Sequence, residues 1–67
     1  MSKSDYYYLR AKSLLSLNNI NECINNLNKL LSFDPTNEHA LVFLGQVLIS
    51  TGKTREGENL MWKANEV

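Results

Sequence analysis

Apolar and small side chains recur along this chain at intervals of three and four residues, the spacing that places them on one side of a helix. Four segments show the pattern, and their repeating residues are Tyr7, Ala11, Leu14 and Leu15; Cys23, Ile24, Leu27, Leu30 and Leu31; Ala40, Leu41, Leu44, Val47 and Leu48; and Gly57, Leu60, Met61 and Ala64. The third segment is apolar around more of its circumference than the others, as expected of a helix with neighbours on two sides. The pattern predicts four helices, over residues 5–17, 21–33, 38–51 and 55–66.

Residues that interrupt helices separate the four segments. Asn18 and Gly52 follow the first and third segments, where the backbone must become left-handed, a conformation that Asn and Gly tolerate best. Pro35 ends the second segment, because the residue before a proline avoids the helical region. Asn37 and Thr54 precede the third and fourth segments, where a side-chain oxygen can cap the free backbone N–H groups. The segments are therefore expected to form two helical hairpins.

The chain superimposes on itself at a spacing of 34 residues, so that residues 4–37 align with residues 38–67. Most of the aligned pairs match in size or polarity. The aligned pairs are Tyr7 and Leu41, Leu14 and Leu48, Asn18 and Gly52, Ile20 and Thr54, Cys23 and Gly57, Leu27 and Met61, Leu30 and Ala64, and Phe33 and Val67. A period of this length indicates a helical-hairpin repeat, an architecture that presents surfaces to other proteins. We expect one domain, residues 1–67, made of repeat one (4–37) and repeat two (38–67).

Two stretches resemble a known repeat family. The run Leu-Val-Phe-Leu-Gly-Gln-Val-Leu at residues 41–48 follows the Trp-x-x-Leu-Gly-x-x-Tyr start of a tetratricopeptide repeat, with leucine in place of both aromatic residues. The run Ser-Phe-Asp-Pro-Thr-Asn at residues 32–37 is similar to the ending of such a repeat. The resemblance implies an all-α fold in which two antiparallel helical hairpins stack as a short solenoid of four helices.

The resemblance also implies a binding surface. In this family the first helix of each repeat lines a concave groove, and the matching positions here are Asp5, Tyr8, Lys12 and Leu15, then His39, Val42, Gln46 and Ile49. A largely apolar groove suits an amphipathic helix of another protein or a second copy of this chain. Family members that grip a peptide's terminal carboxylate use a lysine and asparagines in the groove together with a third repeat. Tyr8 and Phe43 argue against such a clamp.

The two repeats differ on the flank that would meet a following repeat. Ile24 and Leu31 occupy that flank in repeat one, whereas the matching residues in repeat two are the polar Glu58 and Asn65. Because each solenoid repeat buries one flank against the next, this change predicts that repeat two is terminal and that its last helix acts as a solubilising cap. We do not expect the chain to be a fragment of a longer array.

Trp62 stands apart from the core pattern of the last helix. It lies about 100° from Met61 around the helix, and the matching residue in repeat one is the polar Asn28. We therefore expect the indole to be exposed. Tryptophan is enriched in binding hot spots but also shields small cores, so Trp62 is a candidate interface anchor with an equally ordinary structural alternative.

Composition limits the classes of function. A core of this size supplies only about 3 to 5 kcal/mol, so help from association is expected. Seven basic residues balance seven acidic ones, so no overall field attracts nucleic acid or an acidic membrane. The single Cys23 cannot form an intramolecular disulfide, no apolar run approaches the ~20 residues of a membrane span, and no signal-peptide pattern follows Met1. These features predict a soluble cytoplasmic protein without membrane insertion.

Residues that often carry chemistry have simpler explanations here. Tyr6, Tyr7 and Tyr8 could stack on bases, but consecutive helical residues point about 100° apart, so Tyr7 is expected in the core and the others on its flanks. His39 has no second His or Cys at ligand spacing, which argues for a surface residue and against a metal site. Cys23 fits a buried, inert thiol where two helices approach. We expect no catalytic residues, no metal and no cofactor.

Three functions remain open on the sequence alone. The first is a protein interaction module, a small adaptor, chaperone or assembly subunit that binds an amphipathic helix or forms a homodimer through the groove and Trp62. The second is a permanent structural subunit of a larger complex, which would need the same exposed apolar groove. The third is a helix-turn-helix nucleic-acid binder. That hypothesis is weakened because the second helix offers only Lys29, and the fourth only Arg55 and Lys63, among acidic residues.

Overall fold

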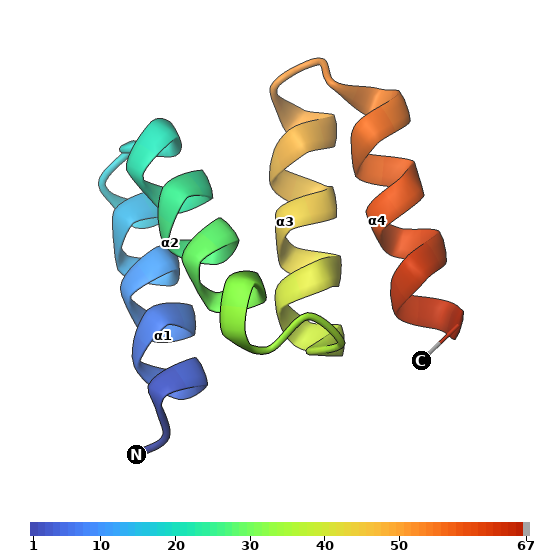
Figure 1. Cartoon of the computed structure of the whole chain (residues 1–67). Helices are drawn as coiled ribbons and strands as arrows, with labels where there is room; N and C mark the ends of the chain where they lie inside the picture. The colour runs from blue at the N-terminus through green and yellow to red at the C-terminus, as the bar shows by residue number, and fades with distance from the viewer. Residues whose placement is uncertain (67) are drawn as a thin grey trace. The chain divides into compact units, whose positions relative to one another are not determined.

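The computed structural model describes residues 1–66 of the chain, which form four helices. These are α1 (Lys3–Ser16), α2 (Ile20–Phe33), α3 (Glu38–Ser50) and α4 (Thr54–Glu66). Figure 1 shows two antiparallel pairs, α1 against α2 and α3 against α4. Residues 1–66 contain no strand. The prediction of an all-α fold built from helical hairpins is confirmed.

The chain forms two compact units, Met1–Pro35 and Thr36–Val67. The first unit is the hairpin of α1 and α2, which we call hairpin one, and the second is the hairpin of α3 and α4, which we call hairpin two. Each hairpin is described by itself below. The expected match of Phe33 with Val67 falls on Val67, which lies outside the described residues.

The turns of the two hairpins have the same geometry. Asn18 has a φ of 61° and Gly52 a φ of 92°, so both adopt the left-handed backbone predicted from their residue types. In hairpin one the N–H groups of Asn18 and Asn19 donate to the carbonyls of Leu15 and Leu14, at 2.9 and 2.8 Å. The same pair of bonds recurs 34 residues later in hairpin two, where Gly52 donates to Ile49 at 3.1 Å and Lys53 donates to Leu48 at 2.9 Å. This pattern is the Schellman motif, which satisfies the last carbonyls of a helix.

The predicted helix boundaries are correct to within two residues, and the differences have local causes. The first helix begins earlier than predicted, at Lys3, because the hydroxyl of Ser2 accepts a hydrogen bond from the backbone N–H of Asp5 at 3.1 Å. Asn37 caps α3 as predicted, accepting from the N–H of Ala40 at 3.0 Å. The prediction that Thr54 precedes the fourth helix is wrong. Thr54 is the first residue of α4, so Lys53 holds the position before the helix.

The core of hairpin one consists of small and branched side chains at the contact between its helices. Ala11, Cys23, Leu27 and Leu30 have no exposed surface. Ala11 is the only buried residue of α1. The expectation that Tyr7 is buried in the core is therefore wrong, because its side chain is only partly buried. Its ring lies 5.7 Å from the ring of Phe33, which is itself 38% exposed.

Hairpin two buries more of its first helix. Six residues of α3 are buried, as its wider apolar surface predicted: Ala40, Leu41, Leu44, Gly45, Val47 and Leu48. The fourth helix contributes only Gly57 and Ala64. At the crossing of the helices Gly45 faces Gly57, and a Cβ atom placed on Gly45 would lie 2.8 Å from the carbonyl oxygen of Gly57. The two backbones therefore touch directly, a closeness that only glycine permits.

Candidate interaction surfaces

The predicted binding residues of hairpin one lie on one side of α1. Tyr8 and Leu15 are partly exposed and Lys12 is exposed. The Lys12 Nζ atom stands 6.0 Å from the centre of the Tyr8 ring, at the outer limit of a cation–π contact. The backbone periodicity explains this proximity, since residues four apart lie one turn above each other. Tyr8 and Lys12 are thus brought together, with Leu15 one turn further along the helix.

The predicted residues of hairpin two lie at the equivalent positions of α3. His39 and Gln46 are exposed, whereas Val42 and Ile49 are partly exposed. Part of the Ile49 side chain already packs within the hairpin, because a Cβ atom on Gly57 would come within 2.6 Å of its Cγ1 atom. Ile49 therefore offers less apolar surface to a partner than its residue type indicates.

The two faces have a common composition. Each carries two partly exposed apolar or aromatic side chains: Tyr8 and Leu15 on α1, Val42 and Ile49 on α3. These residues are neither fully buried nor fully open, which leaves apolar surface available on each hairpin. That the two faces line one groove stays a prediction.

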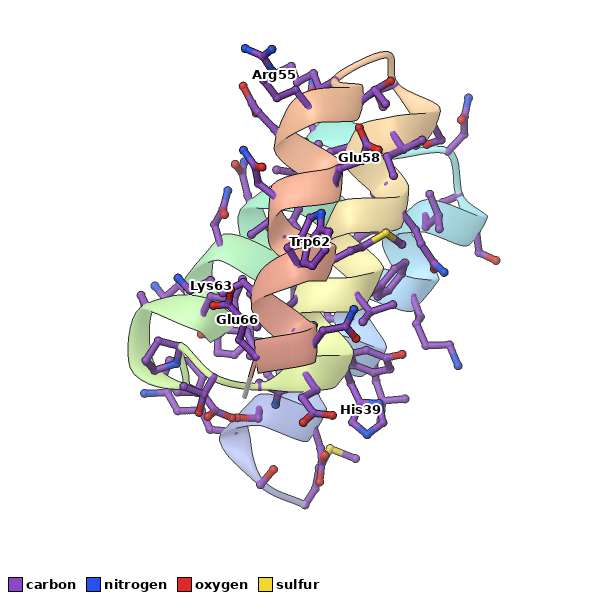
Figure 2. All side chains as sticks on the ribbon, turned by 90° about the vertical axis from the view of Figure 1, so that its right-hand side faces the viewer. His39, Arg55, Glu58, Trp62, Lys63 and Glu66 are labelled. Atoms are coloured by element: carbon purple, nitrogen blue, oxygen red, sulfur yellow. The ribbon has the colours of Figure 1, made fainter. Side chains whose placement is uncertain are left out.

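The outer side of α4 is a further surface, and Trp62 lies at its middle. The indole is 68% exposed, as the sequence predicted. Figure 2 shows the ring standing out from α4, with Glu58 and Lys63 on opposite sides of the helix. Arg55 lies near the start of the helix and Glu66 at its end. We refer to the exposed residues Arg55, Asn59, Trp62 and Glu66 as the α4 stripe.

Sequence reasoning singled out Trp62 but missed the charged members of this stripe. Arg55 and Glu66 lie seven residues before and four residues after Trp62, so all three share one side of the helix. The signal was present in the repeat alignment, because the equivalent residues of α2 carry no charge. Those residues are Asn21, Asn25, Asn28 and Ser32, and all four are exposed.

The start of α1 is tied to the end of α2 by contacts that the sequence pattern did not predict. The hydroxyl of Ser4 donates to Oδ2 of Asp34 at 2.8 Å. The Nζ atom of Lys3 lies 4.7 Å from the centre of the Phe33 ring, a close cation–π distance. These contacts cover part of the exposed Phe33 ring and hold the open end of hairpin one together.

The three consecutive tyrosines do not form one flat face. The rings of Tyr6 and Tyr7 meet edge to face, with centres 5.2 Å apart and planes at 77°. The Tyr6 hydroxyl accepts a hydrogen bond from Arg10 at 3.1 Å. The Tyr8 ring instead lies beside the ammonium group of Lys12. The three rings therefore do not share one face on which successive bases could stack.

Cys23 is a buried thiol. It has no exposed surface, and burial raises its pKa above the ordinary value of 9.0. Burial favours the neutral thiol because the charged thiolate is poorly solvated there. The thiolate is the reactive form, so this environment suppresses both nucleophilic and metal-binding chemistry.

Within residues 1–66, no group of three or more His, Cys, Asp or Glu side chains is arranged to hold a metal ion. None of the helices in this part of the chain combines the length and the apolar character needed to cross a membrane.

A family model described as Tetratricopeptide repeat matches residues 4–37, which are 34 of the 67 residues. No curated protein and no solved structure matches the chain significantly.

Proposed function

We infer the function of this chain from the fact that it belongs to the tetratricopeptide repeat family. Membership indicates a protein–protein interaction module, since this fold is in general non-catalytic and presents helical surfaces to other proteins. We propose that the chain is a small adaptor, chaperone or assembly subunit and that it is not an enzyme. Its ligand is an amphipathic helix of another protein or a second copy of itself.

The observation that carries the proposal is the matched pair of faces on α1 and α3. The partly exposed Tyr8 and Leu15 recur 34 residues later as the partly exposed Val42 and Ile49. Polar residues interleave with them at the matching positions Lys12 and Gln46, while His39 adds a further exposed polar group. An amphipathic helix buries its apolar side chains at i, i+3, i+4 and i+7 positions against such a surface. In this proposal the two faces line one apolar concave groove.

The proposal includes the organisation of the chain. Residues 1–67 act as one domain whose repeats are 4–37 and 38–67, and the protein is cytoplasmic. A lone buried cysteine supports that location, because small domains in oxidising compartments commonly rely on several disulfides. A protein partner, rather than nucleic acid, is supported by the net charge of zero.

Binding through these faces is tested by affinity capture from an extract of the source cells with paired variants. Leu15→Asp places a charge on the proposed binding face, and Ser13→Asp places the same charge at an exposed position elsewhere on α1. We expect a specific protein to be retained by the wild-type chain and by Ser13→Asp but lost with Leu15→Asp. Lys12→Glu serves as a second variant, because Lys12 is exposed and its replacement leaves the core intact. Equal retention by all four chains, each folded by circular dichroism, would refute binding through this face.

A further inference from the structure

The α4 stripe forms one continuous line along the outside of hairpin two. Its residues, Arg55, Asn59, Trp62 and Glu66, follow one another at intervals of four, three and four positions. This spacing keeps them on one side of the helix. All four are exposed, and the indole of Trp62 is 68% exposed. A large exposed aromatic side chain surrounded by polar residues is typical of an interface.

The charges at the two ends of the stripe are not explained by the stability of the helix. Arg55 is the second residue of α4 and Glu66 is its last. A helix has a partial positive charge at its N-terminus and a partial negative charge at its C-terminus, so a cation at the start and an anion at the end are both unfavourable. Glu56 and Lys63 have the favourable placement. The helix dipole therefore gives no reason for the placement of Arg55 or Glu66.

A second α4 helix running antiparallel would give each of these two charges an opposite partner. If a two-fold axis passes midway between Leu60 and Met61, each Arg55 faces Glu66 of the second copy, and each Asn59 faces Trp62 of the second copy. The stripe is thus complementary to itself in charge, as a two-fold interface requires.

We propose that the α4 stripe binds the α4 stripe of a second copy of this chain, antiparallel and about a two-fold axis. Trp62 is the anchor, and the pairs of Arg55 with Glu66 set direction and register. The proposal rests on the proposed function of the chain as a protein interaction module. It assigns self-association to α4 and leaves the faces of α1 and α3 to an amphipathic helix.

The first experiment measures the mass of the full chain by sedimentation equilibrium. A single helix face buries less than the ~800 Å² per partner of a standard interface, so a dissociation constant of roughly 10 to 300 µM is expected. The concentration series should therefore run from about 1 µM to about 1 mM. Trp62→Ala should weaken association at least about tenfold. Asn28→Ala, the same truncation at the equivalent position of α2, should leave it unchanged.

Charge reversal tests the direction of the pairing. Arg55→Glu alone and Glu66→Arg alone each place like charges opposite one another in both pairs, so each should weaken association by about three- to tenfold at low salt. The double variant Arg55→Glu with Glu66→Arg restores opposite charges and should dimerise as tightly as the wild-type chain. In a parallel pair each residue would face its own copy, so neither single variant would differ from the wild type.

Misfolding is separated from loss of pairing by the same variants. Both reversals place charges that suit the helix dipole, so they should leave the melting temperature at low micromolar concentration unchanged or raise it. Asn21→Glu and Ser32→Arg are the matched controls on α2 and should not affect association.

The results that overturn the proposal are specific. They are a wild-type chain that stays monomeric up to about 1 mM, or single reversals that associate as tightly as the wild type. The wider interaction function fails on a different result, the equal capture of partners by Leu15→Asp and the wild type. The two failures are therefore distinguishable.

Discussion

The two hairpins solve the same packing problem at their helix crossing in different ways. Hairpin one places Ala11 and Cys23 at the equivalent positions, and both are fully buried. Hairpin two places Gly45 and Gly57 there, and its backbones touch. The two glycines have no side chains, so at this point α3 meets α4 through backbone atoms and through the side chains of Met61 and Ile49. The equivalent positions are therefore filled by small buried side chains in hairpin one and by glycines in close contact in hairpin two.

The solvent-facing sides of α2 and α4 differ more from each other than the buried helix crossings of the two hairpins do. On α2 the solvent-facing stripe is uncharged and polar, with Asn28 at its middle, whereas on α4 it carries Trp62 between opposite charges. Nothing in the hairpin core requires this change, because all of these residues are exposed. The proposed α4 interface accounts for this difference.

The largest effect is expected from the pair Leu27 and Met61, which occupy equivalent positions. Leu27 has no exposed surface, so Leu27→Ala should destabilise the chain by about 2 to 5 kcal/mol, close to the whole stability of so small a core. Met61 is partly exposed, so Met61→Ala should cost clearly less. Urea unfolding followed by circular dichroism measures both. Equal costs would show that the two positions are equally packed.

The next effect concerns the helix crossing. Gly57→Ala should destabilise by about 1 to 3 kcal/mol, because the added methyl group meets both the Gly45 carbonyl oxygen and Ile49. The gain in helix propensity offsets this cost by up to about 1 kcal/mol, which is included in the range. Thermal unfolding of the variant tests the prediction.

The matched change in hairpin one is Cys23→Ala, which removes only a sulfur atom and leaves a small void. It should cost about 1 kcal/mol or less, in line with the loss of a single buried methylene-sized group.

If Gly57→Ala proved stabilising, the close approach of α3 and α4 would be wrong.

A smaller effect is expected at the turns. Gly52→Ala should cost about 1 kcal/mol, since the φ of 92° is strained for a residue with a Cβ atom, although no side chain lies in its way. Asn18→Gly at the equivalent turn should change stability by only a few tenths of a kcal/mol, because glycine adopts that backbone freely. Comparison of the two melting temperatures checks the left-handed geometry, and an unaffected Gly52→Ala chain would contradict it.

The smallest effect involves the pH dependence of hairpin one. Burial raises the pKa of Cys23, so the folded chain holds the thiol proton more tightly than the unfolded chain. This contribution to stability is fully present below the ordinary thiol pKa of 9.0 and is lost as the pH rises through the higher folded value. The wild-type chain should therefore lose more stability than Cys23→Ala between pH 8 and about pH 10.5. Identical pH profiles for the two chains would show that the thiol titrates as if it were in water.

Much of the fold was predictable because its determinants are local. The left-handed turns at Asn18 and Gly52, the helix end before Pro35 and the cap at Asn37 each depend on one residue type and its immediate neighbours. The start of α1 was misplaced because the capping hydroxyl of Ser2 lies outside the apolar pattern. The capping hydrogen bond sets the start of α1, but the spacing of the apolar residues does not reveal it.

The remaining features depend on distances that a sequence does not state. The alignment showed small residues at Gly45 and Gly57 but not that their backbones touch. Tyr7 has the right spacing for the core, yet at the open end of hairpin one it packs on the exposed Phe33 and stays partly exposed. The exposure of Trp62 was predictable from its polar counterpart Asn28. The opposite charges at the two ends of the α4 stripe were recognised only after the structure had placed both ends on one side of the helix.

The central claim is that α4, and not the equivalent α2, carries a surface for a second copy of the chain. The most direct measurement is a series of ¹⁵N–¹H correlation spectra of the labelled chain recorded over increasing protein concentration. We predict progressive shifts at Arg55, Asn59 and Glu66 and at the indole N–H of the single tryptophan, with none along Asn21, Asn25, Asn28 and Ser32. Spectra that do not change with concentration, or that change equally on both helices, would contradict it.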